Sequence, residues 1–395
     1  MLPFASIIIL RRSCKFLYNS LTDAKFVDLQ LTHALQKSPR YLFTVYDKYQ
    51  LNYKLYTVEQ SGGDLTTSQI QTTSQIRKYS KHRNGGLQSS GGLMCVYSRE
   101  SKSFLIFNSH IREEVQVLDV PIHKYCTNFK WWFFSYSPST KEYKILKIGI
   151  LRSVNEIGDT VFERNVASIS TLGSNIWREI QNVPYYLYVD LFTECQGELF
   201  WVTKSGLMLL FDLVSEKFHE IPGPTLRPAS KSDRLINMGH TVGYVYNYRL
   251  WVLEDKTKGI WINKYDFSTL EMYARGLTGV SGNGGLFGFM ENSTKVFSQD
   301  MSCTNFRAIE IKLDKYIGEV ARHEMISVIG PHIRSLVSPV RVMEMGNKQI
   351  YDHSDLMDIS LKKKWVLETL KLDHDASEDD LFNQVYKFMR DTTTN

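Results

Sequence analysis

The sequence predicts a mainly β protein, and within that class a β-propeller of about six or seven blades. The first observation is the stretch 195–224, where three short apolar runs are separated by polar turn clusters that contain Gly206 and Glu216. The first two runs are apolar at neighbouring positions, as expected for strands that are covered on both faces. A three-stranded meander with two buried faces is not stable alone, so the unit should recur along the chain.

The second observation is that the unit does recur. Aromatic residues that open its last strand follow one another at intervals of 41, 43 and 45 residues, at Trp177, Phe218, Trp261 and Phe306. A period in the forties with several strands per repeat is typical of propeller blades. The composition agrees, because 22 Tyr, 21 Phe and 7 Trp in 395 residues suit strands better than helices. We expect the propeller to occupy residues 37–345.

Residues 1–36 are expected to be helical. Within them, residues 11–34 have the spacing of two short helical segments that meet at a turn at Thr22-Asp23. Residues 1–10 are largely apolar, and the basic pair Arg11-Arg12 follows this run. A secretion signal has its basic residues before the apolar run, so we do not expect one here. No stretch reaches the ~20 apolar residues of a membrane span.

The propeller is predicted to begin with a hairpin in which residues 41–46 pair with 53–58. Residues 61–91 are polar and contain a tandem hexamer, TTSQIQ followed by TTSQIR, so we expect a flexible loop with no fixed structure. The tetrad at 131–134, Trp-Trp-Phe-Phe, should send two rings to each face of a strand. We interpret it as core between blades, in preference to a stacking platform for sugars or bases.

Residues 346–395 are expected to form an acidic extension that contains one helix. Ser377 is placed to cap its start, and Leu381, Val385 and Phe388 give it one apolar face. The helix can pack on the propeller or bind a partner, and the sequence leaves both open.

Charge and cysteine spacing argue against several classes of function. The formal net charge is +5, and the basic residues are scattered through turns instead of clustered, so nucleic acid is not an expected partner. The five cysteines have no metal-ligand spacing and their number is odd, which favours a reducing compartment, the cytoplasm or the nucleus. No membrane partner and no metal are expected.

Motifs of catalysis are also missing from the sequence. His323-Glu324 has no second histidine at the zincin spacing, and no serine lies in a nucleophile elbow. The glycine run 276–288 lacks the lysine of a phosphate-binding loop and is interpreted as a flexible loop between blades. We therefore expect no catalytic residue and no cofactor, and we assign four acids to turns: Asp212, Glu220, Glu254 and Asp255.

The N-terminal segment resembles a known motif. Its pattern is similar to the second half of the F-box of plant F-box proteins, in the positions Cys14-Lys15, Asn19-Ser20-Leu21, Asp23 and Lys25-Phe26. Leu17 stands where the family has tryptophan, and Ala24 where it has proline. The first half of the motif has only a faint echo in Leu2-Pro3, so we expect a truncated F-box. The resemblance implies that an adaptor docks on Cys14, Lys15, Leu17, Leu21 and Phe26.

The rest of the chain resembles the F-box-associated β-propeller of the same family, a kelch-like domain. The matching segments are Gly92 to Val96, Phe107-Asn108, Tyr136-Ser137-Pro138 with Glu142 to Ile145, Gly197 to Trp201, and a closing strand at Ser335 to Pro339.

The resemblance implies a non-catalytic substrate-recognition subunit of a Skp–cullin–F-box ubiquitin ligase. Its partners would be a Skp-type adaptor with its cullin and a target protein bound by the propeller loops. One alternative is an interaction propeller that has lost ligase docking with half of its F-box. A third hypothesis is a carbohydrate-binding or enzymatic propeller.

Overall fold

The computed structural model describes most of the chain, with gaps. The described residues are 4–36, 40–47, 52–61, 64–70, 86–120, 129, 131–154, 160–174, 176–184, 191–203, 205–224, 230, 233–266, 277–280, 285–289, 295–299, 306–310 and 326–347. Two compact units are present, residues 1–29 with 347–395, and residues 30–346.

Three helices form the N-terminal region: α1 (Phe4–Ser13), α2 (Lys15–Thr22) and α3 (Ala24–Gln36). Cys14 is the N-cap of α2, where its Sγ accepts from the amide of Leu17 at 3.5 Å. The Asp23 carboxylate accepts from the amide of Lys25 at 2.9 Å and so caps α3. The predicted turn at Thr22-Asp23 is therefore the junction between α2 and α3.

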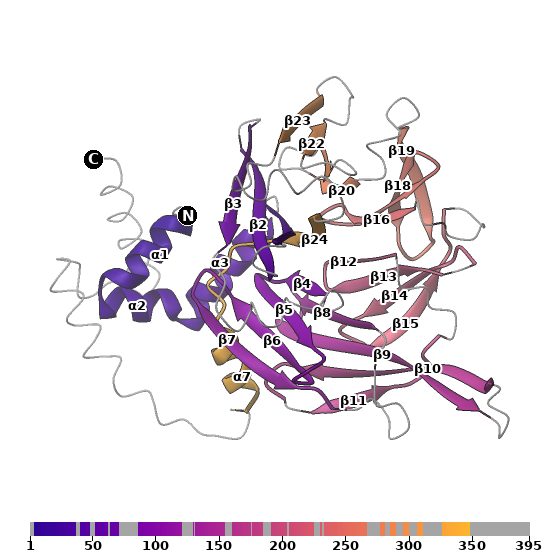
Figure 1. The fold of residues 1–395 in the computed structure, drawn as a ribbon, viewed down its shortest axis with the longest axis horizontal. Coiled ribbons are helices and arrows are strands. Elements are labelled where there is room, and N and C mark those ends of the chain that lie inside the picture. The colour runs from indigo at the N-terminus through magenta and orange to yellow at the C-terminus, as the bar shows by residue number, and fades with distance from the viewer. Residues whose placement is uncertain are drawn as a thin grey trace. The chain divides into compact units, whose positions relative to one another are not determined.

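The described strands form four four-stranded sheets and one eight-stranded sheet, drawn as a ring of twisted sheets in Figure 1. The eight-stranded sheet consists of two four-stranded meanders joined by a single parallel pair, so we count six blades. Blade 1 consists of β24 (Ile326–His332), β1 (Arg40–Asp47), β2 (Asn52–Ser61) and β3 (Asp64–Ile70). Blade 2 consists of β4 (Leu87–Ser90), β5 (Leu93–Ser98), β6 (Ser103–Asn108) and β7 (Glu113–Leu118). Blade 3 consists of β8 (Trp131–Ser137), β9 (Glu142–Val154), β10 (Thr160–Thr171) and β11 (Trp177–Ile180). Blade 4 consists of β12 (Phe192–Cys195), β13 (Glu198–Val202), β14 (Met208–Asp212) and β15 (Lys217–Ile221). Blade 5 consists of β16 (Arg234–Asn237), β17 (Val242–Tyr246), β18 (Arg249–Asp255) and β19 (Ile260–Asp266). Blade 6 consists of β20 (Leu277–Val280), β21 (Leu286–Phe289), β22 (Lys295–Gln299) and β23 (Phe306–Glu310).

Each blade is an antiparallel meander whose first strand lies innermost. Neighbouring first strands contact one another, as in β24 with β4, β4 with β8, and β16 with β20. Blades 5 and 6 are further joined by one parallel pair, Asn237 with Gly279. The predicted propeller is confirmed, and the six blades lie within the predicted range.

The ring is closed by pairing between the two ends of the propeller. β24, the last strand in sequence, pairs antiparallel with β1, from Arg40 opposite His332 to Val45 opposite Ile326. A bulge between Leu42 and Phe43 adjusts the register. Blade 1 is thus built from both ends of the domain, which ties them together.

The hydrophobic core lies between blades, and alternation along each strand explains it. In β13, Leu199 and Trp201 pack with the core of blade 3. The intervening residues Phe200 and Val202 pack with blade 5. Because successive side chains point to opposite faces, a strand between two blades must be apolar at every position. This confirms the interpretation of the 195–224 stretch.

Most predicted strand positions are confirmed. The predicted hairpin has the expected register, from Tyr41 opposite Val58 to Tyr46 opposite Tyr53. The four periodic aromatic residues all lie in the outermost strand of their blades, β11, β15, β19 and β23. Trp131 and Phe133 pack with blade 4, and Trp132 contacts Phe104 of blade 2 with ring centroids 5.4 Å apart. The tetrad is therefore core between blades.

Three expectations are corrected. The segment 61–91 contains β3 and β4, because the β-branched residues of its first hexamer pair with β2; residues 71–85 lie outside the described part. The glycine run 276–288 contributes β20 and β21, since its apolar residues pair as a hairpin. The closing strand is β24, and the segment expected to be that strand, Ser335 to Pro339, is not one: residues 335–338 are irregular and Pro339 begins helix α7 (Pro339–Asn347). The helix predicted around Ser377 lies outside the described residues.

Two histidines lie at the closure, His332 buried and His110 partly buried. His332 of β24 stacks on His110 of blade 2, with centroids 5.7 Å apart, and its Nδ1 hydrogen-bonds the Ser89 hydroxyl at 2.8 Å. Burial, with the charge of Arg40 nearby, lowers the pKa of His110 to about 4. Burial, with His110 and Arg40, lowers the pKa of His332 to about 3. Both rings are therefore neutral in the folded protein at neutral pH.

We predict that the propeller loses stability as the pH falls below about 6.5. Between that value and the lowered pKa values, the unfolded chain binds protons that the folded chain excludes, so the free energy of unfolding decreases. At 1.36 kcal/mol per unit over the two pH units from 6.5 to 4.5, His332 alone should lower the free energy of unfolding by about 3 kcal/mol. Urea unfolding across this range should show a smaller decrease for His332→Gln than for the control His219→Gln, which changes an exposed histidine. Equal slopes for both variants would contradict the prediction.

Candidate functional surfaces

The two ends of the propeller differ in the length of their connections. Turns from first to second strand and from third to fourth strand have two to six residues, whereas the connections between blades have 10 to 16. Because the strands alternate in direction, all the short turns of these two kinds lie at one end. The connections between blades lie at the other end. We call these the turn end and the connection end.

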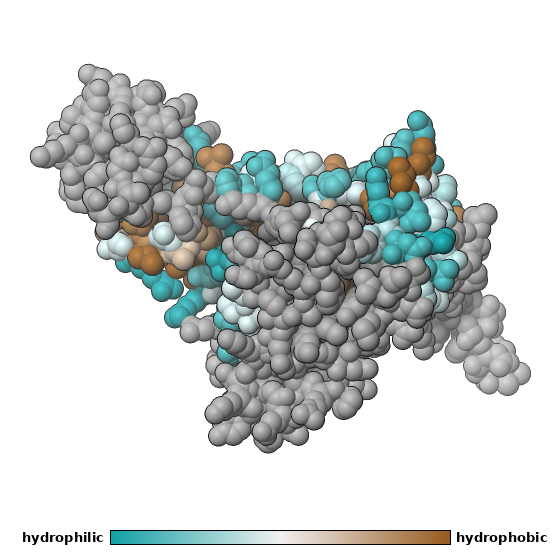
Figure 2. All heavy atoms as spheres, turned by 90° about the horizontal axis from the view of Figure 1, so that it is seen from above, coloured by the Kyte–Doolittle hydropathy of each residue, from teal (hydrophilic) through white to brown (hydrophobic). Residues whose placement is uncertain are grey.

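The N-terminal helices carry exposed apolar side chains. Ile9 is 67% exposed, Tyr18 42% and Leu29 53%. Where these helices are coloured in Figure 2, hydrophobic and hydrophilic surface alternate. The Arg11 guanidinium lies 5.1 Å from the ring centroid of Tyr18, which packs α1 against α2.

The five predicted docking residues are not all at the surface. Cys14 and Lys15 are exposed, and Leu17 and Phe26 are partly exposed. Leu21 is only 3% exposed, so its side chain belongs to the packing of the helices. The exposed apolar residues Ile9, Tyr18 and Leu29 were missed, because the motif that located this segment says nothing of which helix faces stay uncovered.

A buried amide joint holds the end of α3 at the turn end of the ring. Gln30, which is 5% exposed, donates from Nε2 to the carbonyl of Arg334 at 2.9 Å and accepts from the amide of Leu336 at 3.0 Å. One side chain thereby pairs with an extended backbone as a neighbouring strand would. Residues 333–338, between β24 and α7, form the extended segment that it holds.

The same segment is held from its other side by blade 2. Asn108 donates from Nδ2 to the carbonyls of Ser335 and Val337, both at 2.9 Å. The Ser335 hydroxyl donates to the carbonyl of Gly92 at 3.1 Å. Gly92 has a φ of +77°, and a Cβ there would collide with Ser335, so only glycine fits. Gly92, Asn108 and Ser335, which belong to the segments that carried the family resemblance, therefore hold residues 333–338 against blade 2.

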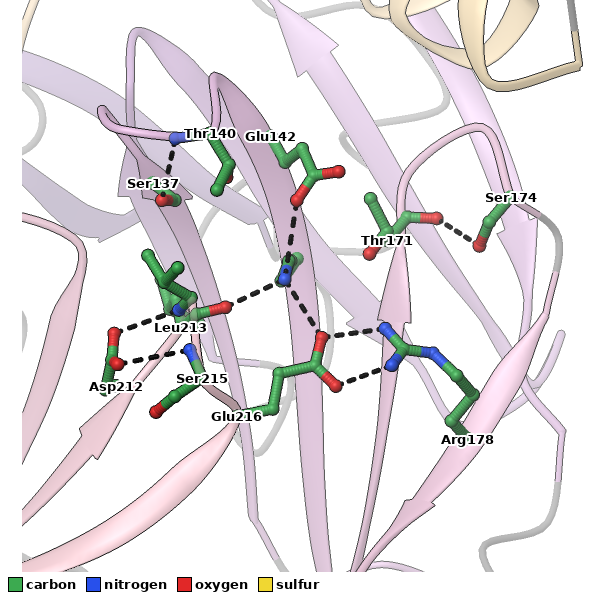
Figure 3. Close-up of polar contacts among 12 residues, drawn as sticks. Ser137, Thr140, Glu142, Thr171, Ser174, Arg178, Asp212, Leu213, Ser215 and Glu216 are labelled. Carbon is green, nitrogen blue, oxygen red and sulfur yellow. Dashed lines mark hydrogen bonds and ion pairs between the residues drawn. The ribbon is translucent and has the colours of Figure 1, made fainter. Parts of the chain in front are cut away.

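A charged cluster joins blades 3 and 4, as Figure 3 shows. Lys144 of β9 donates to the carbonyl of Leu213 at 2.8 Å and to Glu216 at 2.9 Å. Arg178 of β11 binds the same carboxylate through two nitrogens, at 2.6 and 2.7 Å. Burial alone would raise the pKa of Glu216, but its hydrogen bonds and ion pairs with Arg178 and Lys144 hold that pKa below its usual value.

A second lysine of β9 joins blades 3 and 2. Lys147, which is fully buried, donates to the Asp119 carboxylate at 2.6 Å and lies 3.8 Å from the ring centroid of Trp177. Tyr97 donates to the other oxygen of Asp119 at 2.9 Å. Lys144 and Lys147 are three positions apart and therefore point to opposite faces, one toward each neighbouring blade.

Polar side chains join the innermost strands. Gln88 of β4 donates to the carbonyl of Trp132 at 2.7 Å and accepts from the amide of Phe134 at 2.8 Å. Asn237 of β16 donates to the backbone carbonyl of Glu194 at 2.7 Å. The inner strands of neighbouring blades are too divergent for a regular ladder, so amide side chains satisfy the backbone instead.

Glu194 on β12 is the one strongly perturbed carboxyl among the described residues. It accepts from the Ser90 hydroxyl at 3.2 Å and weakly from the amide of Gly197 at 3.4 Å. Burial raises the pKa of Glu194 to about 7, and these hydrogen bonds only partly oppose the shift. Sequence reasoning missed this residue, because a single acid in a short strand carries no motif.

The acids assigned to turns divide into two pairs. Asp212 accepts from the amides of Val214 and Ser215, and Asp255 from those of Thr257 and Lys258, as predicted. Glu220 and Glu254 lie in strands β15 and β18, so for them the turn assignment was wrong. Over the described ranges, no group of three or more His, Cys, Asp or Glu residues could hold a metal ion. No described helix is long and apolar enough to span a membrane.

The described strands define a β-propeller of six blades, and a short helical segment precedes it in the sequence. The model of the F-box associated beta propeller domain family matches residues 40–329. The chain therefore belongs to the family of F-box-associated β-propeller proteins.

Two curated relatives come from Arabidopsis thaliana. F-box protein At3g07870 is 27% identical over an alignment of 213 residues, and the match covers 46% of this chain and 50% of that protein. Putative F-box protein At5g62060 is 26% identical over an alignment of 191 residues, and the match covers 44% of this chain and 61% of that protein. The matches thus span half to three fifths of these relatives.

Solved structures resemble the chain only distantly. A chain of the crystal structure of the nidogen/laminin complex is 9% identical, with a TM-score of 0.43 over 76% of this chain and 99% of that one. Pyrococcus horikoshii acylaminoacyl peptidase is 10% identical, with a TM-score of 0.35 over 69% and 44%. At these values the likeness carries no functional argument.

We predict that Glu216→Gln lowers the free energy of unfolding by about 1 to 3 kcal/mol. The change removes the charge opposite Lys144, which is 5% exposed and cannot regain water. Arg178→Gln should cost less than about 1 kcal/mol, because Arg178 is 52% exposed. Urea unfolding of the two variants provides the comparison. Equal losses would show that the buried lysine does not depend on Glu216.

We predict that Gln30→Ala exposes the 334–336 segment to solvent exchange. Without the amide, the carbonyl of Arg334 and the amide of Leu336 lose their partners, at a cost of about 1 to 3 kcal/mol. Hydrogen exchange of Leu336 should accelerate at least tenfold, whereas exchange in β13 should stay unchanged. The matched control is Gln69→Ala, which truncates an exposed glutamine of β3. Unchanged protection of the Leu336 amide would contradict the prediction that Gln30 shields this segment from exchange.

Proposed function

We propose that this protein is a non-catalytic substrate-recognition subunit of a Skp–cullin–F-box ubiquitin ligase. The observation that carries the proposal is the family assignment of residues 40–329, together with the F-box pattern in the helices before them. Adaptor and cullin would dock on the N-terminal helices, and the propeller would bind a target protein. The cytoplasm or the nucleus is the compartment where such a ligase would act.

The arrangement of the propeller supports a division of labour between its two ends. The turn end holds the last part of α3 through Gln30, and its turns are short. The connection end carries the six longest connections of the ring, and long loops on a rigid scaffold are where binding residues concentrate. We place target binding at the connection end.

An interaction propeller without ligase docking is the second candidate. The burial of Leu21 favours it, because the F-box resemblance would need this side chain at the adaptor surface. In that case the connection end would still bind a protein partner, and the N-terminal helices would serve only the fold.

Co-purification with a plant Skp-type adaptor tests the proposal. The full chain should retain the adaptor, and Leu17→Asp with Phe26→Asp should reduce retention at least tenfold, because charges would replace partly exposed apolar contacts. Lys102→Glu, at an exposed turn of the connection end, is the matched control and should leave retention unchanged. No retention of the unaltered chain, where an intact F-box protein is retained, would reject the ligase role and leave the second candidate.

A further inference from the structure

The innermost strand of blade 4 combines an exposed aromatic ring with a carboxyl that forms no ion pair with any described residue. Phe192 is 37% exposed, and its ring meets that of Phe133 edge-on, with centroids 4.9 Å apart. Glu194 lies two residues further on, so both side chains lie on the same face of β12. At about 3.3 Å per residue, the two positions are about 7 Å apart.

The surroundings of Glu194 are polar but uncharged. Its carboxyl receives hydrogen bonds from Ser90 and Gly197, and among the residues that the structure describes no charged group contributes to its raised pKa. The hydroxyl of Ser135, which is 1% exposed, lies close enough to lower that pKa but completes no hydrogen bond of normal geometry. The site therefore has acceptor capacity left over, and Glu194 itself remains partly exposed.

The residues around Glu194 favour a basic side chain over a divalent metal as the ligand of this site. A divalent metal needs several oxygen ligands, and the described residues offer no group of three acids, histidines or cysteines. A lysine or arginine side chain brings both parts that the site lacks. Its aliphatic stem spans a distance of the same order as the separation of Phe192 and Glu194, and its cationic head compensates the charge of a partly buried carboxylate.

We propose that this face of β12 binds a lysine or arginine side chain of a partner protein, with the stem on Phe192 and the head on Glu194. The proposal rests on the proposed function only in taking the propeller to be a protein-binding module. It names the chemistry of one contact in the target: a basic residue that the inner ring of the propeller recognises.

Host peptides of the form Gly-Gly-X-Gly-Gly test this with the full chain. With X as lysine or arginine, calorimetric titration should show at least tenfold tighter binding than with norleucine, which has a stem but no charge. Glu194→Gln should remove that difference, and Phe192→Ala should weaken all three peptides. Glu254→Gln changes an exposed acid of β18 and should change nothing. Binding of the lysine peptide should also weaken as the pH falls below about 7, where the carboxyl gains a proton.

A second measurement needs no variant and so does not depend on whether Glu194→Gln folds. Carbon NMR of the Glu194 carboxyl should show its pKa fall by at least one unit when the lysine peptide is bound. Equal affinity for norleucine and lysine, or an unchanged pKa, would overturn the proposal. Displacement of the peptide by micromolar Ca²⁺ alone would show a metal site instead. Co-purification with the adaptor tests the ligase role independently of peptide binding. A failed co-purification would therefore reject the ligase role without affecting the peptide-binding result.

Discussion

The structure depends on one constraint, that each sheet must be covered on both faces. In blade 4, residues 199–202 of β13 and 208–211 of β14 are all apolar, and alternate residues such as Leu199 and Phe200 pack into two different interfaces. A row of such sheets would leave apolar faces open at both ends, at about 25 cal/mol for each Å² exposed to water. Closing the row into a ring removes both ends. The pairing of β1 with β24 performs that closure, so the stability of every blade is linked to it.

Polar side chains then fix how the blades meet. Hydrophobic contacts are not directional and do not set the angle between neighbouring sheets, whereas Lys144 and Lys147 each reach a defined acceptor on the next blade. Gln88 and Asn237 do the same between the innermost strands. Each buried lysine is tolerated because its charge has a carboxylate partner and a carbonyl or ring beside it. The result is a rigid scaffold with long connections at one end.

This scaffold relates to function through the difference between its ends. The turn end is occupied by short turns and by the joint that Gln30 makes with residues 333–338. The connections between blades, of 10 to 16 residues, start and end at the other end. Glu194 differs from the residues at both ends, as a carboxyl on the innermost strand that no described cation pairs with. Because Lys144 and Lys147 are paired with acids, packing of the described blades does not explain this acid.

The sequence by itself determined the blades, because their signals are local. Two-residue alternation, turn residues and a period of 41 to 45 residues located most strands, and the order of short motifs indicated the family. Only the tertiary structure decided which strand closes the ring, which lysines meet which carboxylates, and that Leu21 is buried while Tyr18 is exposed. The physical reason is distance along the chain. Arg40 and His332 pair across nearly three hundred residues, and a strand pattern states that a face is covered without stating by what.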